Sequence, residues 1–160
     1  MTTEIQSAPA SDRVVVGVDG SPASLEALEW ALRYSSMTRS AVDVVAAWDW
    51  PVNLSLVPIA PNFAPAMSAE QVLDCLIRQR RAEHPDLHID GRVVQGDAAS
   101  VLEDASKGAA LLVIATRGHR ELVGFLLGSV SEHCATHAQC PVLVYRSGSQ
   151  SSMLDTPRGA

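Results

Sequence analysis

Runs of strand-forming residues alternate with segments of helical periodicity along the central part of this chain. Strands are predicted over residues 13–19, 41–48, 88–94, 110–116 and 141–145. Two of these runs, residues 13–19 and 110–116, are apolar throughout, a pattern typical of strands buried on both faces of a parallel sheet. A leucine repeat at helical spacing predicts a helix over residues 22–36. Further helices are predicted from residue 68 onward and over residues 98–107 and 129–138.

Capping residues indicate where two of these helices begin. Ser21 is a good N-cap and Pro22 suits the first helical position. Ser68-Ala-Glu-Gln71 has the spacing of a capping box, so the second helix is expected to begin at Ser68. Three arginines near the end of that helix suit the helix dipole and are expected to form a solvated face. They are Arg78, Arg80 and Arg81.

The order of strands and helices predicts an α/β fold with a parallel sheet, right-handed crossovers and helices on both faces. In such sheets a ligand binds at the carboxyl ends of the strands, near the point where the strand order reverses. The residues at those ends are Asp19, Trp48, Gly96 and Thr116. Residues 49–66 are rich in proline and predict a long irregular loop, which we interpret as a lid over the site.

Composition narrows the class of protein. The 160 residues suffice for one domain, and an apolar fraction of 47% provides a core. A net charge of −6 makes binding to nucleic acid or to an anionic membrane unfavourable. We expect no membrane span, since no apolar run approaches the roughly 20 residues of a transmembrane helix, and we find no signal-peptide pattern at the start. Three irregularly spaced cysteines favour a reducing cytoplasm.

The ends of the chain differ in composition from its centre. Residues 1–12 and 147–160 are small and polar, so we expect a disordered N-terminal tail and a flexible C-terminal tail. Residues 13–146 form the predicted domain, in which no internal repeat is visible.

The segment from Ala115 to Ser129 carries the clearest candidate chemistry. Gly118 and Gly128 bracket nine residues between a buried strand and a helix. Glycines let the backbone approach a phosphate chain, and a helix N-terminus supplies N–H groups and a favourable field. A structural alternative is open, because Ser129 and Glu132 also have the spacing of a capping box. The sequence contains neither a P-loop motif nor a Gly-x-Ser-x-Gly elbow.

Four pieces of the sequence match one known pattern. They are Val14-Val-Val-Gly-Val-Asp-Gly-Ser21, the strand ending near Trp48, the loop of Gly-x2-Gly-x9-Gly-Ser type, and Gly128-Ser-Val-Ser-Glu-His133 running on to Cys140-Pro-Val-Leu-Val-Tyr-Arg146. On these residues the chain resembles a single-domain universal stress protein, of the adenine nucleotide α-hydrolase-like group. The resemblance covers residues 13–146 and implies a Rossmann-like fold of five parallel strands in the order 3-2-1-4-5. The family includes members that bind ATP through that loop and members that lack it.

The resemblance also implies roles for single residues. Asp19 would meet the ribose, and this role is favoured over the alternative of a simple strand-end turn. The backbone of Gly17 and Val18 would line the adenine pocket, and Trp48 would offer backbone groups to the adenine edge. The implied phosphate-binding residues are Ala115, Thr116, Arg117, Gly118, Gly128, Ser129 and Val130. Ala115 stands where the loop usually has its first glycine, which weakens binding only if that position needs a positive φ.

These roles lead to three hypotheses about function. The first is a non-catalytic stress protein that binds ATP, with Mg²⁺, as a regulatory ligand; AMP or cAMP would suit the same pocket. The second is a slow ATPase, with Asp19, His119 or Glu121 as the base that positions water. The third is a dimeric interaction module without a nucleotide, in which Ala115 has abolished binding.

The last predicted strand suggests how the chain assembles. An apolar edge strand presents unpaired N–H and C=O groups, which a second copy satisfies about a two-fold axis. The sequence therefore predicts a homodimer with Val142, Leu143 and Val144 at its centre, and the resemblance implies an antiparallel contact through this strand.

Histidines and cysteines near the last helix suggest a zinc site, but their spacing does not support one. The residues are His133, Cys134, His137 and Cys140. Cys134 has a different helical azimuth from His133, and Cys140 directly precedes a strand, so we predict no metal site. We expect Cys75 and Cys134 to be buried in the core instead.

Overall fold

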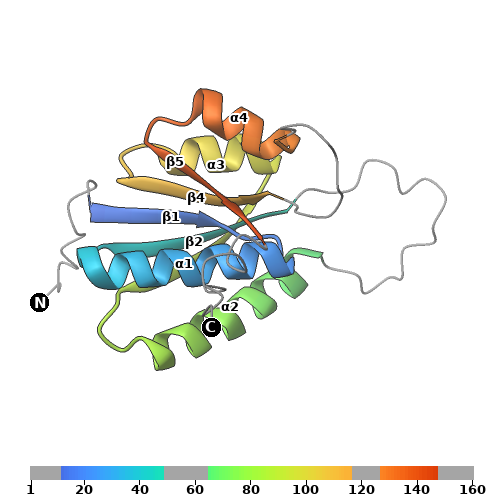
Figure 1. Ribbon diagram of the computed structural model, residues 1–160. Helices are drawn as coiled ribbons and strands as arrows, with labels where there is room; N and C mark the ends of the chain where they lie inside the picture. The colour runs from blue at the N-terminus through green and yellow to red at the C-terminus, as the bar shows by residue number, and fades with distance from the viewer. Residues whose placement is uncertain (1–11, 49–64, 117–126, 148–160) are drawn as a thin grey trace, which may run out of the picture.

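The computed structural model describes residues 12–48, 65–116 and 127–147 (Figure 1). Within these residues strands and helices alternate along the chain. In chain order they are β1 (Arg13–Gly17), α1 (Pro22–Thr38), β2 (Ala41–Trp48), α2 (Pro65–Glu83), β3 (Ile89–Gln95), α3 (Ala98–Ser106), β4 (Leu111–Thr116), α4 (Ser129–His137) and β5 (Val142–Arg146). The predicted alternation is confirmed, and most boundaries differ from the predicted ones by one to three residues.

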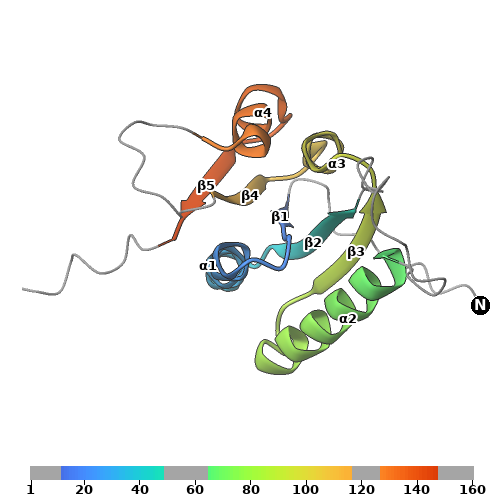
Figure 2. The same ribbon diagram turned by 90° about the vertical axis from the view of Figure 1, so that its right-hand side faces the viewer.

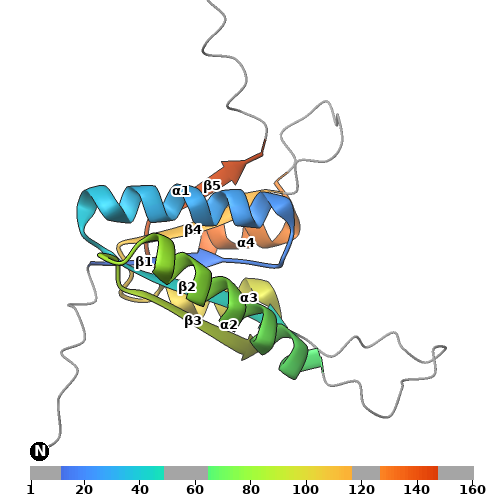
Figure 3. The same cartoon turned by 90° about the horizontal axis from the view of Figure 1, so that it is seen from below.

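The five strands form one parallel sheet in the order β3-β2-β1-β4-β5, which confirms the predicted fold class. α1 and α2 cover one face of the sheet, and α3 and α4 cover the other (Figures 1 and 2). Figure 3 shows the first face, with α1 and α2 lying over the strands. The chain adds β2 and β3 on one side of β1, then β4 and β5 on the other, so the strand order reverses between β1 and β4.

The central strand divides the hydrophobic core between the two faces of the sheet. Val14 and Val16 pack with Leu28 and Leu32 of α1, whereas Val15 packs with residues of α3 and α4. All three valines are completely buried. A strand with both faces covered has no polar face, which explains its uninterrupted apolar sequence.

The start of α1 has the predicted capping arrangement. Ser21 is the N-cap, and its hydroxyl accepts a hydrogen bond of 3.2 Å from the Ser24 N–H. Pro22 occupies the first helical position, where its missing N–H costs no hydrogen bond. The helix ends before Arg39, which has a φ of 59°.

The start of α2 differs from the prediction. The helix begins at Pro65, so Ser68 lies inside the helix and the predicted capping box is wrong. Proline fits the first turn of a helix, because the N–H groups there lack intrahelical acceptors, and the helix can therefore begin before the serine.

The predicted solvated face of α2 is only partly present. The Arg78 side chain is 77% exposed, but that of Arg80 is only 16% exposed. Arg80 forms an ion pair of 2.9 Å with Glu29 of α1 and another of 2.6 Å with Glu83. Its guanidinium therefore joins the two helices on this face of the sheet.

Candidate functional site

The described residues of the predicted site lie at one end of the sheet, where the carboxyl ends of the strands meet. We call this end the carboxyl edge. β1 ends at Gly17, β2 at Trp48 and β4 at Thr116, all at this edge. α4 also begins here, because it leads from the end of β4 back to the start of β5 (Figure 1). Since the strand order reverses between β1 and β4, this edge is where doubly wound sheets hold ligands.

Other predicted parts of the site cannot be placed. Arg117 and Gly118 lie outside the described residues, as do His119, Arg120 and Glu121 of the same segment. Residues 49–64, which form most of the predicted lid, also lie outside them, and the rest of that predicted loop belongs to α2.

Asp19 shapes the turn between β1 and α1. Its Oδ1 accepts a hydrogen bond of 2.9 Å from the Ser21 N–H, and its own N–H donates to the buried Ser24 Oγ at 3.3 Å. Gly20 follows with a φ of +78°, a conformation that favours glycine. The turn-forming interpretation of Asp19 is therefore confirmed, and its contact with a ribose stays a prediction.

Gly17 and Val18 are held by the sheet and by α3. A Cβ at Gly17 would lie 2.9 Å from Leu102 Cδ1, so this terminal methyl of α3 would have to move aside. The Val18 N–H donates to Val45 O at 2.9 Å, and the side chain is buried. Both residues thus have contacts within the fold, and their adenine contacts stay a prediction.

Trp48 lies beside the turn between β3 and α3. Its carbonyl accepts a hydrogen bond of 2.8 Å from the Gly96 N–H. Gly96 has a φ of +138°, and Asp97 caps α3 by accepting from the Ser100 N–H at 3.1 Å. From the sequence, Gly96 was predicted only as a strand end, with no role of its own. Because Gly96 bonds to β2, the turn between β3 and α3 lies next to Trp48 in the candidate site.

The N-terminus of α4 has no side-chain cap. Gly128 is the N-cap, with a φ of −62° and a ψ of 160°, and Ser129 is the first helical residue. The capping-box interpretation of Ser129 is therefore wrong, since the helix begins one residue earlier than that motif requires. Ser129 is exposed, whereas the Val130 side chain packs against the core. The first turn of a helix offers N–H groups that have no intrahelical acceptor.

Ala115 and Thr116 belong to β4. Ala115 pairs with Tyr145 of β5, and its side chain packs against the core beneath α1. Among the described residues other than glycine, only Arg39 has a positive φ. The structure thus shows that position 115 does not need the conformation that alanine resists. Thr116 is buried at the end of the strand and pairs with Arg146.

The histidines and cysteines of α4 form no metal centre in the described part of the chain, where no group of three potential ligands occurs. Cys134 is completely buried, and burial raises the pKa of its thiol to about 11. Cys75 is exposed, so its predicted burial is wrong. Cys140 is partly buried, and desolvation raises the pKa of its thiol as well.

Comparison with known proteins gives consistent results. The model of the universal stress protein family matches residues 10–146. A universal stress protein of Mycobacterium tuberculosis is 37% identical over 139 residues, which are 86% of this chain and 46% of that protein. One of Mycolicibacterium smegmatis is 34% identical over 137 residues, or 83% of this chain and 45% of that protein. The chain thus spans about half the length of these curated relatives.

A solved structure gives the same picture in three dimensions. A universal stress protein in complex with cAMP is 25% identical and has a TM-score of 0.64. The similarity covers 85% of this chain and 97% of that one.

The reversal of strand order, with helices on both faces, defines a doubly wound α/β protein. In such proteins ligands bind at the carboxyl ends of the strands. The chain belongs to the universal stress protein family. None of its described helices combines the length and the apolar character that a membrane span requires.

Proposed function

We propose that this protein binds an adenine nucleotide at the carboxyl edge of the sheet, as a regulatory ligand in a stress response. The main support for this proposal is the environment of Gly128. A Cβ built there meets no atom of the described residues within 4 Å, and its φ of −62° suits any residue. Packing within the described part of the chain therefore does not require glycine at this helix start, whereas close approach of a phosphate would.

The surroundings of Gly128 suit a phosphate chain. The first N–H groups of α4 face the ligand edge, and a helix N-terminus attracts anions. The Ser129 hydroxyl is exposed and does not cap the helix, so it is available as an additional donor. Asp19 approaches from the opposite side of the strand reversal, where its backbone N–H is fixed by Ser24.

The related structure supports adenine as the base, because that protein was solved in complex with cAMP. For this chain the finer proposal is ATP with Mg²⁺, and AMP and cAMP are the alternatives. A ligand that binds only the folded state stabilises it by mass action. Binding could in this way regulate the protein without chemical turnover.

A test of this proposal uses the helix cap itself. Mass spectrometry of the nucleotide released on denaturation identifies the natural ligand, and calorimetry with ATP, AMP, cAMP and GTP ranks affinities. Gly128→Ser should weaken the binding of ATP by about tenfold, because a side chain enters the phosphate path. The same change should leave thermal stability equal or slightly higher, since serine caps a helix at least as well as glycine. Unchanged ATP affinity in this variant, or no heat with any adenine nucleotide, would contradict the proposal.

We also propose that the protein is a homodimer in which β5 pairs with its own copy. Val142, Leu143, Val144 and Tyr145 are all only half-buried. A half-exposed apolar strand at a sheet edge is stabilised when a second copy covers it.

The cysteines suggest where the protein works. Cys75, Cys134 and Cys140 are all free thiols, which is typical of proteins in reducing compartments. We propose a cytoplasmic location on this basis.

A further inference from the structure

The helix that would bind phosphate has few apolar contacts of its own. α4 has nine residues, and only Ser131 and Cys134 among them are buried. Its N-cap contributes no side-chain hydrogen bond. So short a helix is marginal in isolation, and its position must depend on tertiary contacts.

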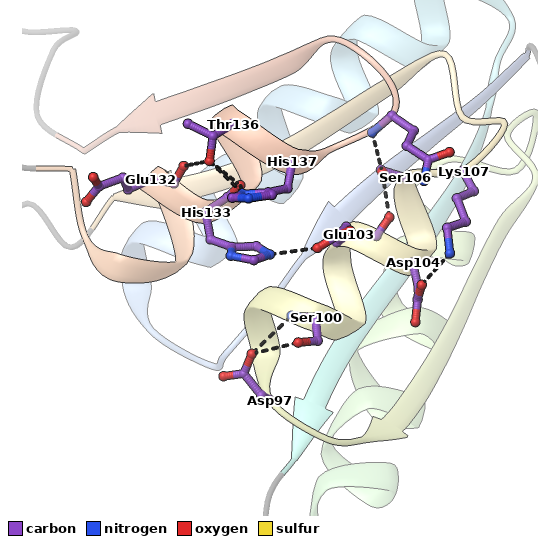
Figure 4. Close-up of polar contacts among 11 residues, drawn as sticks. Asp97, Ser100, Glu103, Asp104, Ser106, Lys107, Glu132, His133, Thr136 and His137 are labelled. Carbon is purple, nitrogen blue, oxygen red and sulfur yellow. Dashed lines mark hydrogen bonds and ion pairs between the residues drawn. The ribbon is translucent and has the colours of Figure 1, made fainter.

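Two polar contacts from α3 hold α4 in place (Figure 4). Glu103 Oε2 lies 2.7 Å from His133 Nε2, one turn after the start of α4. Ser106 Oγ accepts a hydrogen bond of 2.9 Å from the Gln139 N–H, just beyond the end of α4. The same hydroxyl donates to Glu103 O at 2.6 Å. α3 therefore contacts α4 near both of its ends.

α3 also touches the opposite side of the candidate site. It begins at Asp97, directly after Gly96, whose N–H bonds the Trp48 carbonyl. We call the contact between Glu103 and His133 the α3–α4 clamp. The helix α3 thus extends from the predicted adenine side of the site to this clamp on α4, whose N-terminus is the predicted phosphate-binding end.

The clamp contains a titratable ring within a defined set of neighbours. The His137 ring stacks on His133 with centroids 4.3 Å apart, and His137 Nδ1 lies 2.7 Å from Thr136 Oγ1. The stacked pair therefore lies directly beside the Glu103 carboxylate.

Other ionisable groups near His133 do not replace Glu103. On α3, Asp97 caps its own helix and Asp104 pairs with Lys107. On α4, Glu132 points away from α3 in Figure 4. The Cys134 thiol, with its pKa raised to about 11 by burial, is neutral at physiological pH.

The strands beneath α4 contribute little charge to this cluster. β4 contains no ionisable side chain. β5 presents Val142 and Val144 to this face, and strand alternation adds Arg146 at its far end. Glu103 is therefore the carboxylate in direct contact with His133.

We propose that Glu103, acting through His133, is a positioning residue for the N-terminus of α4 and makes phosphate binding there dependent on pH. This inference rests on the proposed function. Imidazole gains its charge between about pH 8 and pH 5, and a bond between two charged groups is roughly twice as strong as a neutral one. The clamp is therefore stronger when His133 is protonated, and this contribution is lost as the pH rises. A small shift of α4 moves its N–H groups relative to a phosphate, but not the adenine side of the site.

The test compares two ligands and two variants. Glu103→Gln keeps a hydrogen-bond acceptor for His133 but removes the charge. Asp104→Asn removes a carboxylate from the next position of the same helix, where it contacts only Lys107 in the described residues. Calorimetry with ATP and with adenosine at about pH 6 and about pH 8 gives the ratio of each variant's Kd to that of the wild type. This ratio cancels the titration of the nucleotide's own phosphates.

For ATP, the ratio for Glu103→Gln should rise by about threefold between pH 8 and pH 6, because the lost charge matters most when His133 is protonated. For adenosine, it should stay near one at both pH values. Asp104→Asn should leave both ligands unaffected. A ratio for ATP that does not change with pH, or an equal change for adenosine, would overturn the inference and leave the proposed function intact. A wild-type protein that binds neither ligand would overturn both.

Discussion

The two edge strands of the sheet, β3 and β5, expose opposite kinds of surface. In β3, Asp90, Gly91 and Arg92 are exposed in succession. In β5, Val142, Leu143, Val144 and Tyr145 are half-buried in succession, and Arg146 is exposed at the end of the strand. Both strands carry backbone groups that the sheet leaves unpaired on the outer side, but the longer run of half-buried apolar residues in β5 is better suited to a partner.

The free edge of β3 is covered by the chain itself. Because His88 O and the Gly96 N–H both bond β2, the groups of Ile89, Gly91 and Val93 point outward by strand alternation. Arg81 Nε donates to Ile89 O at 2.7 Å, and its guanidinium forms an ion pair of 2.8 Å with Asp90. A charged side chain laid over an edge carbonyl hinders pairing with another chain.

The outer edge of β5 has no such cover at its centre among the described residues. Since Pro141 O accepts from the Leu112 N–H, Val142 and Val144 direct their backbone groups outward. Tyr145 and Ser147 contact Glu26 of α1, which fixes the end of the strand without covering its edge. The comparison indicates that this protein blocks pairing at one edge and leaves the other suited to it.

A proline substitution in each edge strand should give the largest difference between β5 and β3 in its effect on the dimer. Val144→Pro removes an N–H that points outward from β5, and it spares the hydrogen bonds to β4. We expect the proposed dimer to dissociate at least about tenfold more readily, as sedimentation measures it. Val93→Pro removes the equivalent outward N–H from β3 and is the matched control, because it should leave the dimer intact. Equal loss of the dimer in both variants would contradict the assignment of β5 as the interface.

The second prediction concerns the helix that packs on β3. A Cβ at Gly91 would lie 2.6 Å from Ile77 Cγ1, so α2 approaches this strand too closely for alanine. Gly91→Ala should lower the free energy of unfolding by about 1–3 kcal/mol, measured by urea denaturation. Gly128→Ala, where no atom of the described residues lies within 4 Å of the added Cβ, should cost less than about 1 kcal/mol. Similar losses in the two variants would show that packing of α2 does not limit position 91.

Removing the cover from β3 should produce a smaller change in stability. Arg81→Met removes the bonds to Ile89 O and Asp90 but keeps an apolar stem. Because the pair with Asp90 is half-exposed, we expect a loss of less than about 1 kcal/mol. The variant should nevertheless form species larger than the wild type in light scattering, since the outer edge of β3 is open. Arg78→Met is the control, as Arg78 is exposed and pairs only with Asp74 of the same helix among the described residues. Identical size distributions in both variants would argue against the protective role of Arg81.

Salt should have the smallest effect on the proposed dimer. Its effect distinguishes an apolar interface from a charged one. Raising NaCl from about 0.05 M to about 0.5 M screens exposed charges but not apolar contacts. The Kd of the proposed wild-type dimer should therefore change less than about twofold. Stronger dissociation in high salt, followed by sedimentation, would indicate a charged interface in place of β5.

Capping shows where sequence reasoning worked and where it did not. Ser21 was predicted and found as an N-cap, because Pro22 follows it and restricts where the helix begins. Ser68 and Ser129 have equally good spacing, yet neither caps a helix. A capping motif identifies a possible start, and the packing of the helix on the sheet selects the actual one.

Burial along α2 could be predicted only in part. Leu73 and Ile77 are buried and pack on β3, whereas Val72 is exposed and Cys75, for which we predicted burial, faces solvent. The helical period gives the spacing of a buried face but not its width, which depends on how closely the strand beneath approaches. Gly91 permits that approach, and it is distant from α2 in the sequence.

The class of fold, the apolar central strands and the position at which α4 begins could all be predicted from the sequence, because they follow from local periodicity and chain order. The glycine spacing also pointed to Gly128 as a candidate phosphate-binding residue. Three features became visible only in the folded molecule: Arg80 joins α2 to α1 through Glu29, Arg81 covers an edge carbonyl of β3, and Glu103 contacts His133. Each of these depends on contacts between residues far apart in the chain, and such contacts are set by packing and not by local preference.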